Sequence, residues 1–222
     1  MKAIGILLLG LGLFTVSSCE EFLYENFEGK GPLVKRTLKV GAFQEVEVSN
    51  AMKLYIRQGE KQSVVVKSHK NVLKHLDAKV RSGRLEFDLD RGNYRNLDVS
   101  IYITVPSIQY IGASGASEIE LQHFNHLNQL QFDFSGASSF EAFGEETTID
   151  HLIVDLSGAG EINAFKLKCK NIDLDLSGAS TCEVFATQHL NLDVSGASEI
   201  RYKGNPHIRQ DVSGASSVQA VD

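Results

Sequence analysis

The stretch Asn171–Ile200 decides the fold of this chain, and it reads NIDLDLSGASTCEVFATQHLNLDVSGASEI. It holds one unit twice: alternating apolar and polar residues, then Asp, an apolar residue and the tripeptide Ser-Gly-Ala. This tripeptide occurs six times in the chain, starting at Ser114, Ser135, Ser157, Ser177, Ser195 and Ser213. The starts are 21, 22, 20, 18 and 18 residues apart, and such regular self-similarity indicates stacked structural repeats.

Each tripeptide follows a strand pattern with a period of two. Leu174 and Leu176 alternate with polar residues, as do Leu192 and Val194, and this is typical of a strand with one buried face. An apolar residue also recurs after each motif, as at Ile162. We therefore predict a second short strand beyond a corner at Gly-Ala, where glycine permits a sharp turn and close stacking.

These units predict an all-β fold, a parallel β-helix with coils of about 18–22 residues. A leucine-rich repeat has a similar length but a different signature, and a propeller blade is about twice as long. We expect right-handed coiling, the default for L-amino acids. The repeat coils occupy about residues 108–222, and the β-rich segment before them is expected to continue the same stack. Residues 70–77 could form one helical turn.

The first residues predict export. Residues 1–19 read MKAIGILLLGLGLFTVSSC, with an uncharged run from Ala3 to Val16. That run is shorter than the about 20 residues that span a bilayer and fits a secretory signal. Val16-Ser17-Ser18-Cys19 resembles a bacterial lipobox, whose Cys carries the lipid; an ordinary signal peptide is the alternative. We predict a signal peptide over 1–18, lipid attachment at Cys19, a tether over 19–32 and one domain over 33–222.

Two acidic residues, Glu20 and Glu21, follow Cys19 directly. They resemble the export signal of surface lipoproteins in Bacteroidetes-type bacteria, and a solvated tether is the alternative. The sequence therefore predicts a bacterial outer-membrane lipoprotein, either surface-exposed or facing the periplasm.

The composition narrows the function. The chain has 222 residues, 22 Lys plus Arg against 28 Asp plus Glu, and a formal charge of −6. This argues against a nucleic-acid partner, which usually meets a basic face. Three Cys are too few for a disulfide scaffold, and the chain has no phosphate loop, dinucleotide fingerprint or Cys-x-x-Cys motif.

Five aspartates at one repeat position form the sharpest candidate site. We call them the Asp ladder: Asp133, Asp155, Asp175, Asp193 and Asp211. By parity they point outward, ~4.8 Å apart on adjacent coils, where neighbouring carboxylates repel by roughly 0.9 kcal/mol per pair in water. We expect each to be offset by hydrogen bonds from its own corner. The alternatives are a bound cation such as Ca²⁺ and contact with a partner; no other cofactor is expected.

A second polar column lies four residues before the Asp ladder. It contains Gln129, His151, Asn171, His189 and His207. Four residues of strand separate His and Asp of one coil by ~13 Å, which is too far for shared Zn²⁺ ligands. We therefore predict a polar solvated column and no metal site.

Two further features are weighed in the same way. Cys169 and Cys182 occupy apolar repeat positions, so buried core thiols are expected, with a disulfide as the alternative in an oxidising compartment. The longer coil at 117–130 predicts a protruding loop that carries His123 and His126.

The chain resembles the head-GIN-domain family, described as putative auto-transporter adhesins, over about residues 33–222. The resemblance rests on Gly41-x-Phe43, Val46-Glu47-Val48-Ser49, Leu54–Gly59 (LYIRQG) and the Ser-Gly-Ala-Ser coils. Asn50-Ala51-Met52 departs from the expected pattern. The resemblance implies a β-helical envelope protein, often lipid-anchored, and implies no established activity.

Together these features predict a lipid-anchored envelope module that binds glycan or protein through a polar face of the solenoid. One alternative is a polysaccharide lyase or hydrolase, because some β-helices cleave polysaccharides with outward carboxylates. Five equivalent aspartates, however, lack the asymmetry of a catalytic pair. Another alternative is a purely structural or assembly lipoprotein, and open solenoid ends make a homo-oligomer a further alternative.

Overall fold

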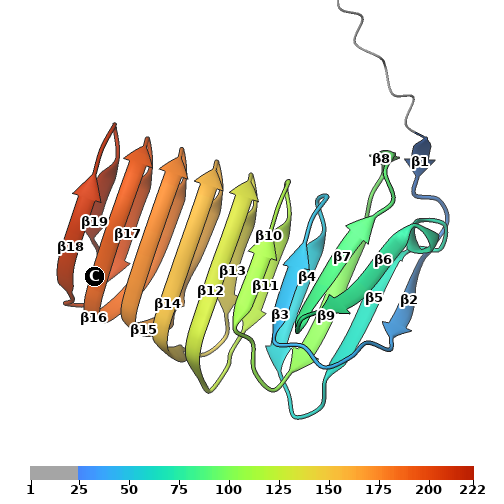
Figure 1. The fold of residues 1–222 in the computed structure, drawn as a ribbon, viewed down its shortest axis with the longest axis horizontal. Coiled ribbons are helices and arrows are strands. Elements are labelled where there is room, and N and C mark those ends of the chain that lie inside the picture. Colours follow the sequence, from blue (N-terminus) through green and yellow to red (C-terminus); the bar gives the residue numbers. More distant parts are fainter. Residues whose placement is uncertain (1–24) are drawn as a thin grey trace, which may run out of the picture.

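The structure is a computed structural model that describes residues 25–222 (Figure 1). The predicted signal peptide, Cys19, Glu20 and Glu21 lie outside the described residues. Within the predicted tether, β1 (Asn26–Glu28) pairs in parallel with β8 (Asn93–Arg95). Phe27 stacks on Tyr94, with ring centroids 5.0 Å apart.

The fold is an all-β solenoid of stacked parallel coils, as the repeat predicts (Figure 1). Strands before each Ser-Gly-Ala corner form one side, which we call the ladder sheet. It runs from β6 (Leu76–Arg81) and β7 (Arg84–Leu89) through β3 (Glu45–Val48), β10 (Tyr110–Ala113) and β12 (His126–Gly136) to β14 (Thr147–Gly158), β15 (Glu161–Gly178), β16 (Thr181–Gly196) and β18 (His207–Val212).

Strands beyond the corners form the opposite side, the second sheet. It runs from β2 (Leu33–Leu38) and β5 (Ser63–His69) through β9 (Val99–Val105), β4 (Lys53–Gln58), β11 (Glu118–Gln122) and β13 (Ser139–Phe143) to the first halves of β15 and β16, then β17 (Glu199–Lys203) and β19 (Ser217–Ala220). The long strands β15 and β16 contribute to both sheets, because each begins after one corner and ends at the next.

The order of the coils differs from the order of the sequence at the N-terminal end. The coil of β3 and β4 lies between the coil of β7 and β9 and that of β10 and β11. Antiparallel pairing of β6 with β7, and of β5 with β9 and β2, closes this end. A 3₁₀ turn at Val72–Lys74 matches the helical turn expected within 70–77. Within residues 25–222, no helix has the length and hydrophobicity to cross a membrane.

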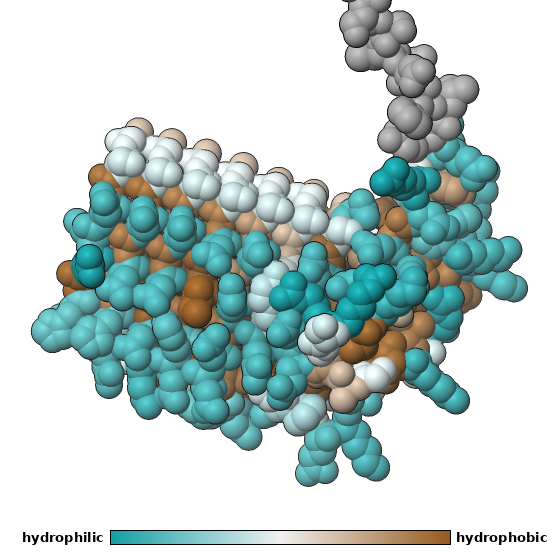
Figure 2. Space-filling model, viewed as in Figure 1, coloured by the Kyte–Doolittle hydropathy of each residue, from teal (hydrophilic) through white to brown (hydrophobic). Residues whose placement is uncertain are grey.

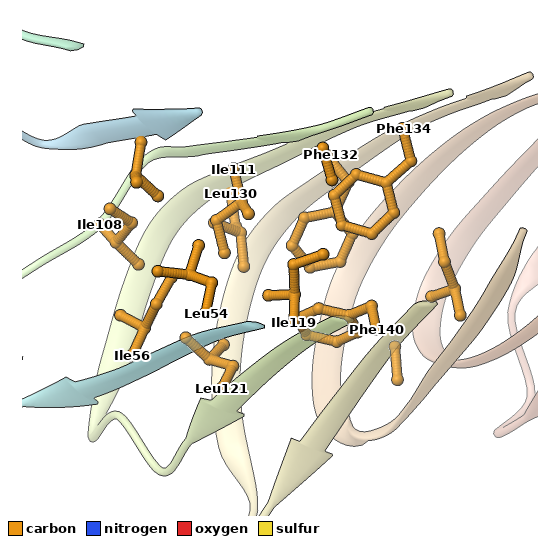
Figure 3. Packing of buried hydrophobic residues seen from close by; sticks show 14 of the residues in the cluster. Leu54, Ile56, Ile108, Ile111, Ile119, Leu121, Leu130, Phe132, Phe134 and Phe140 are labelled. Carbon is orange, nitrogen blue, oxygen red and sulfur yellow. The ribbon is translucent and has the colours of Figure 1, made fainter. Parts of the chain in front are cut away.

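The core fills the space between the two sheets. Ile119, Phe132, Phe134 and Phe140 from successive strands point toward one another (Figure 3), and the rings of Phe132 and Phe140 lie 4.4 Å apart. Alternate residues along the central strands, such as β4, β14 and β16, are buried. Burial of these apolar side chains, about 25 cal/mol per Å² removed from water, is the main stabilising contribution.

Cys169 and Cys182 belong to this core. Both are buried and free, in register with Ile149 and Ile162 respectively. Burial raises the pKa of both thiols, that of Cys182 to about 12. The prediction of buried core thiols is confirmed, and the alternative of a disulfide is excluded in this structure.

Glycine corners fix the coil spacing. Gly178 has φ +108°, and a Cβ there would overlap the carbonyl oxygen of Gly158 on the preceding coil. That oxygen accepts the N–H of Ala179 at 2.8 Å. A straight pale ridge of small residues follows the upper edge of the molecule, where these strands end (Figure 2). In the coil of β3 and β4, Asn50 and Ala51 turn the corner with φ +59° and +58°. The departure from the family pattern thus lies at a corner.

Candidate binding face on the ladder sheet

The Asp ladder forms as the sequence predicts. Asp133, Asp155, Asp175, Asp193 and Asp211 are in register on consecutive coils. All five side chains point outward, and all but Asp155, which is half-buried, are exposed. Because parallel strands lie ~4.8 Å apart, this places a row of like charges along an open sheet.

The hydrogen bonds of the Asp ladder differ from the expected capping. The Tyr110 hydroxyl donates to Asp133 Oδ2 at 3.2 Å, and Gln131 Nε2 donates to Asp155 Oδ2 at 3.3 Å. Within residues 25–222, no ladder aspartate accepts a bond from its own corner, and Asp175, Asp193 and Asp211 have no hydrogen-bond or ion-pair partner there. The corner N–H groups donate instead to carbonyls of the preceding coil.

The acidic column extends further than the repeat motif. Glu47 and Glu86 are in register with it, separated from Asp133 by Gly112. Sequence reasoning missed both, although Glu47-Val48-Ser49 has the same order of residue types as Asp193-Val194-Ser195. A search for the repeat motif that accepted Glu in place of Asp, and that did not require Gly after Ser, would have found Glu47.

Arg84 neutralises this end of the column. Its Nε donates to Glu45 at 2.9 Å, its Nη1 lies 3.3 Å from Glu47, and its guanidinium carbon lies 3.8 Å from the centre of the Tyr110 ring. Tyr110 fills the space over Gly112. Burial, followed by the negative charge of Asp133, raises the pKa of Tyr110 to about 12, so this hydroxyl stays a donor. Unpaired negative charge therefore gathers in the C-terminal part of the Asp ladder.

The His column is also in register, from Gln129 through His151, Asn171 and His189 to His207. The rings of His189 and His207 stack with centroids 5.7 Å apart. Residues 25–222 contain no group of three or more His, Cys, Asp or Glu side chains placed to hold a metal ion.

His151 pairs with an aspartate outside the Asp ladder. Its Nε2 lies 2.7 Å from Asp173 Oδ2, on the next coil and two residues before Asp175. Asn191 donates to the other Asp173 oxygen at 2.7 Å. Burial would raise the pKa of Asp173, but these two hydrogen bonds outweigh it and hold the pKa below its usual value.

A depression of about 620 Å³ lies on this face. Its polar lining comes from Asp155, Asp173, Asp175, Asn191, Asp193, Arg209, Gln210 and Asp211. Its volume falls within the about 300–1,000 Å³ of ligand pockets. The lining offers many acceptors and few donors, which suits a ligand that presents hydroxyl or cationic groups.

The expected loop at 117–130 is not a protrusion. Strands β11 and β12 leave only residues 123–125 between them, and Phe124 is fully buried. His126 starts β12 and bonds to the next coil, with Nδ1 3.1 Å from the Thr148 hydroxyl. The extra residues of this coil do not protrude, because Phe124 packs into the core. The prediction of a protruding loop was therefore wrong.

The fold and the ladder sheet define a β-solenoid with an open polar face. The chain matches the family described as "putative auto-transporter adhesin, head GIN domain" over residues 42–206. The chain belongs to this family, as the sequence resemblance implied. No curated protein matches it.

Solved structures share the fold. One is described as a putative adhesin from Bacteroides fragilis, with TM-score 0.70, 19% identity, and coverage of 88% of this chain and 100% of that one. Another is described as a putative lipid binding protein from Parabacteroides distasonis, with TM-score 0.60, 18% identity, and coverage of 89% and 100%. At these identities the likeness concerns the fold alone. The adhesin-like family favours a non-enzymatic protein of the cell envelope or surface.

Proposed function

We propose that this protein is a lipid-anchored module of the bacterial outer membrane that binds a partner through the ladder sheet. The observation that carries the proposal is a row of exposed carboxylates, Asp175, Asp193 and Asp211, for which residues 25–222 supply no hydrogen-bond or ion-pair partner. Such a row repels itself, so a ligand that offers donors or positive charge gains at every coil. Membership of an adhesin-like family supports the same conclusion.

The carboxylates of the ladder sheet favour two classes of partner, a neutral glycan or a basic protein surface. Hydroxyls of a neutral sugar can donate to carboxylates, and Arg or Lys can pair with them. An acidic partner would be repelled by the Asp ladder. Many weak contacts that repeat from coil to coil would supply the affinity.

Binding is tested with the double substitution Asp175→Asn and Asp193→Asn. The variant should lose binding to neutral-glycan arrays and to surfaces of its source cells. Its thermal stability should not fall, because the substitutions relieve the repulsion between adjacent carboxylates. The control is Asp88→Asn, an exposed carboxyl on β7 outside the ladder column, which should bind as the unchanged protein does. Equal binding by all three proteins would contradict a role for the ladder sheet.

Location is tested by protease accessibility on intact and lysed cells of the source bacterium. Digestion on intact cells is expected for a surface binding module. Protection until lysis would place the solenoid in the periplasm and favour the structural or assembly alternative. Mass spectrometry of the mature N-terminus tests lipid attachment at Cys19.

One observation bears on the enzymatic alternative. Asp155 and Asp173 line the same depression, and the pKa of Asp155 is raised while that of Asp173 is lowered; such opposite shifts are found in acid–base pairs. Asp173, however, is held by His151 and Asn191. Release of reducing ends from polysaccharide that stops on Asp155→Asn substitution would establish enzymatic cleavage, and we expect no release.

A further inference from the structure

A separate depression lies on the second sheet, over β4, β5 and β9. Tyr55 and Tyr102 are in register there, and their rings stack with centroids 4.9 Å apart and planes 10° apart. That separation equals the strand spacing, so the rings stack along the row of strands. Tyr102 is 38% exposed, one of the most exposed large hydrophobic side chains among the described residues.

Tyr55 and Tyr102 both line the depression. Tyr102 lies on the strand between those of Tyr55 and Val65, so the ring face turned away from Tyr55 is directed toward β5. The next residue in register is Val65, which is too short to cover a phenol ring. Ser63, Thr104 and Gln122 supply polar groups around the same space. The cavity volume of about 330 Å³ is at the lower end for ligand pockets, with room for one small ring.

The charged side chains that line this depression are cationic, whereas the chain as a whole carries a formal charge of −6. The charged lining of the depression consists of Lys35 and Arg57, without a carboxylate, whereas four other depressions each contain Asp or Glu. Neither cation forms an ion pair within residues 25–222. Arg57 Nε donates to the Thr104 hydroxyl at 2.9 Å, which orients the guanidinium and leaves its terminal N–H groups available.

We propose that this depression binds a pyranose ring that carries a carboxylate, as in a uronic-acid unit of an acidic glycan. The C–H face of the sugar lies on the outer face of Tyr102, because aromatic faces carry negative charge and attract polarised C–H groups. The carboxylate pairs with Arg57, whose planar fork matches it, and with Lys35. The inference goes beyond the proposed function, since it concerns another sheet and a ligand that the Asp ladder would repel.

The test compares two sugars that differ only in the carboxylate: methyl β-D-glucuronide and methyl β-D-glucoside. Saturation-transfer NMR and titration on the purified protein should show the glucuronide binding roughly tenfold more tightly, as expected for a hydrogen bond to a charged group. Arg57→Gln should weaken glucuronide binding, and the double substitution Arg57→Gln with Lys35→Gln should reduce it to the glucoside level. Both variants should leave glucoside binding unchanged. Tyr102→Ala should abolish the binding of both sugars.

Three controls keep the result interpretable. Tyr102→Phe keeps the ring and should keep binding. Ser63→Glu, at an exposed position, places a carboxylate in the depression and should expel the glucuronide even if Tyr102→Ala fails to fold. Asp193→Asn, on the ladder sheet, should change nothing, so a failure of the ladder proposal and a failure of this one are distinguishable.

The proposal is overturned by any of four results. These are no glucuronide binding, equal binding of both sugars, binding that survives Tyr102→Ala, and binding of tetraglutamate as tightly as the glucuronide. The last result would identify an acidic peptide as the ligand. Raising NaCl to about 0.5 M should weaken the binding of the glucuronide and leave the binding of the glucoside unchanged, because salt screens exposed charges.

Discussion

Asp155 lies between Asp133 and Asp175 on adjacent coils. Burial, followed by the two neighbouring carboxylates, raises its pKa above the usual value, although the bond from Gln131 opposes this. The folded state thus favours the protonated form. Its contribution to stability is full below the unfolded pKa of about 4 and is lost as pH rises through the raised value.

We expect Asp155→Asn to stabilise the protein at pH 7, by up to about 1 kcal/mol in low salt. Asn removes the repulsion and keeps an acceptor for Gln131. The gain should vanish near pH 3, where Asp155 is already protonated, and should shrink in high salt. Urea unfolding at the two pH values measures it.

The matched control is Asp150→Asn, a residue five positions earlier on the same strand. The hydrogen bond from Lys170 lowers the pKa of Asp150, so its ionised form is the stabilising one and the substitution should destabilise at pH 7. If both substitutions moved stability in the same direction, ladder repulsion would not be the cause.

The Ser-Gly-Ala corner determines how closely adjacent coils stack. We expect Gly178→Ala to destabilise by more than the about 1–2 kcal/mol that a left-handed conformation costs a residue with a Cβ, because its Cβ also overlaps the Gly158 carbonyl oxygen. Gly83→Ala separates the two effects: Gly83 has φ +85° with nothing within 4 Å of an added Cβ. Thermal melts of both variants give the comparison, and equal losses would show that coil stacking tolerates a methyl group.

The Ser-Gly-Ala corner also explains which features of the fold the sequence could predict. Ser-Gly-Ala marks each corner because the left-handed turn and the close stacking both require glycine, so strands, register and the Asp ladder followed from spacing. The prediction of a protruding loop was wrong because spacing alone could not show that the Phe124 side chain is buried in the core. Glu47 was missed because Asn50 and Ala51 turn its corner without glycine. The tyrosine pair was missed because no repeat position marks it.

At the scale of the whole molecule, the arrangement that sequence spacing could not show is the position of β3 and β4. They join the closed N-terminal end to the repeat coils, since β4 pairs with both β9 and β11. Pairing between segments so distant in sequence leaves no periodic signal. One hydrophobic core consequently runs from the N-terminal strands through the repeat coils.

This continuity predicts how the molecule unfolds. Leu54 on β4 is fully buried, and Leu54→Ala should cost about 2–5 kcal/mol. Hydrogen exchange should then accelerate both in β9, which pairs with β4, and in the distant β14–β16, because one continuous hydrophobic core connects them to Leu54. Ile208→Ala on β18, where the side chain is 41% exposed, should cost much less and accelerate exchange only nearby. Stacked repeats can also behave as a chain of nearest-neighbour units. Unchanged protection of β14–β16 in Leu54→Ala would therefore show that the repeat coils fold without the N-terminal end.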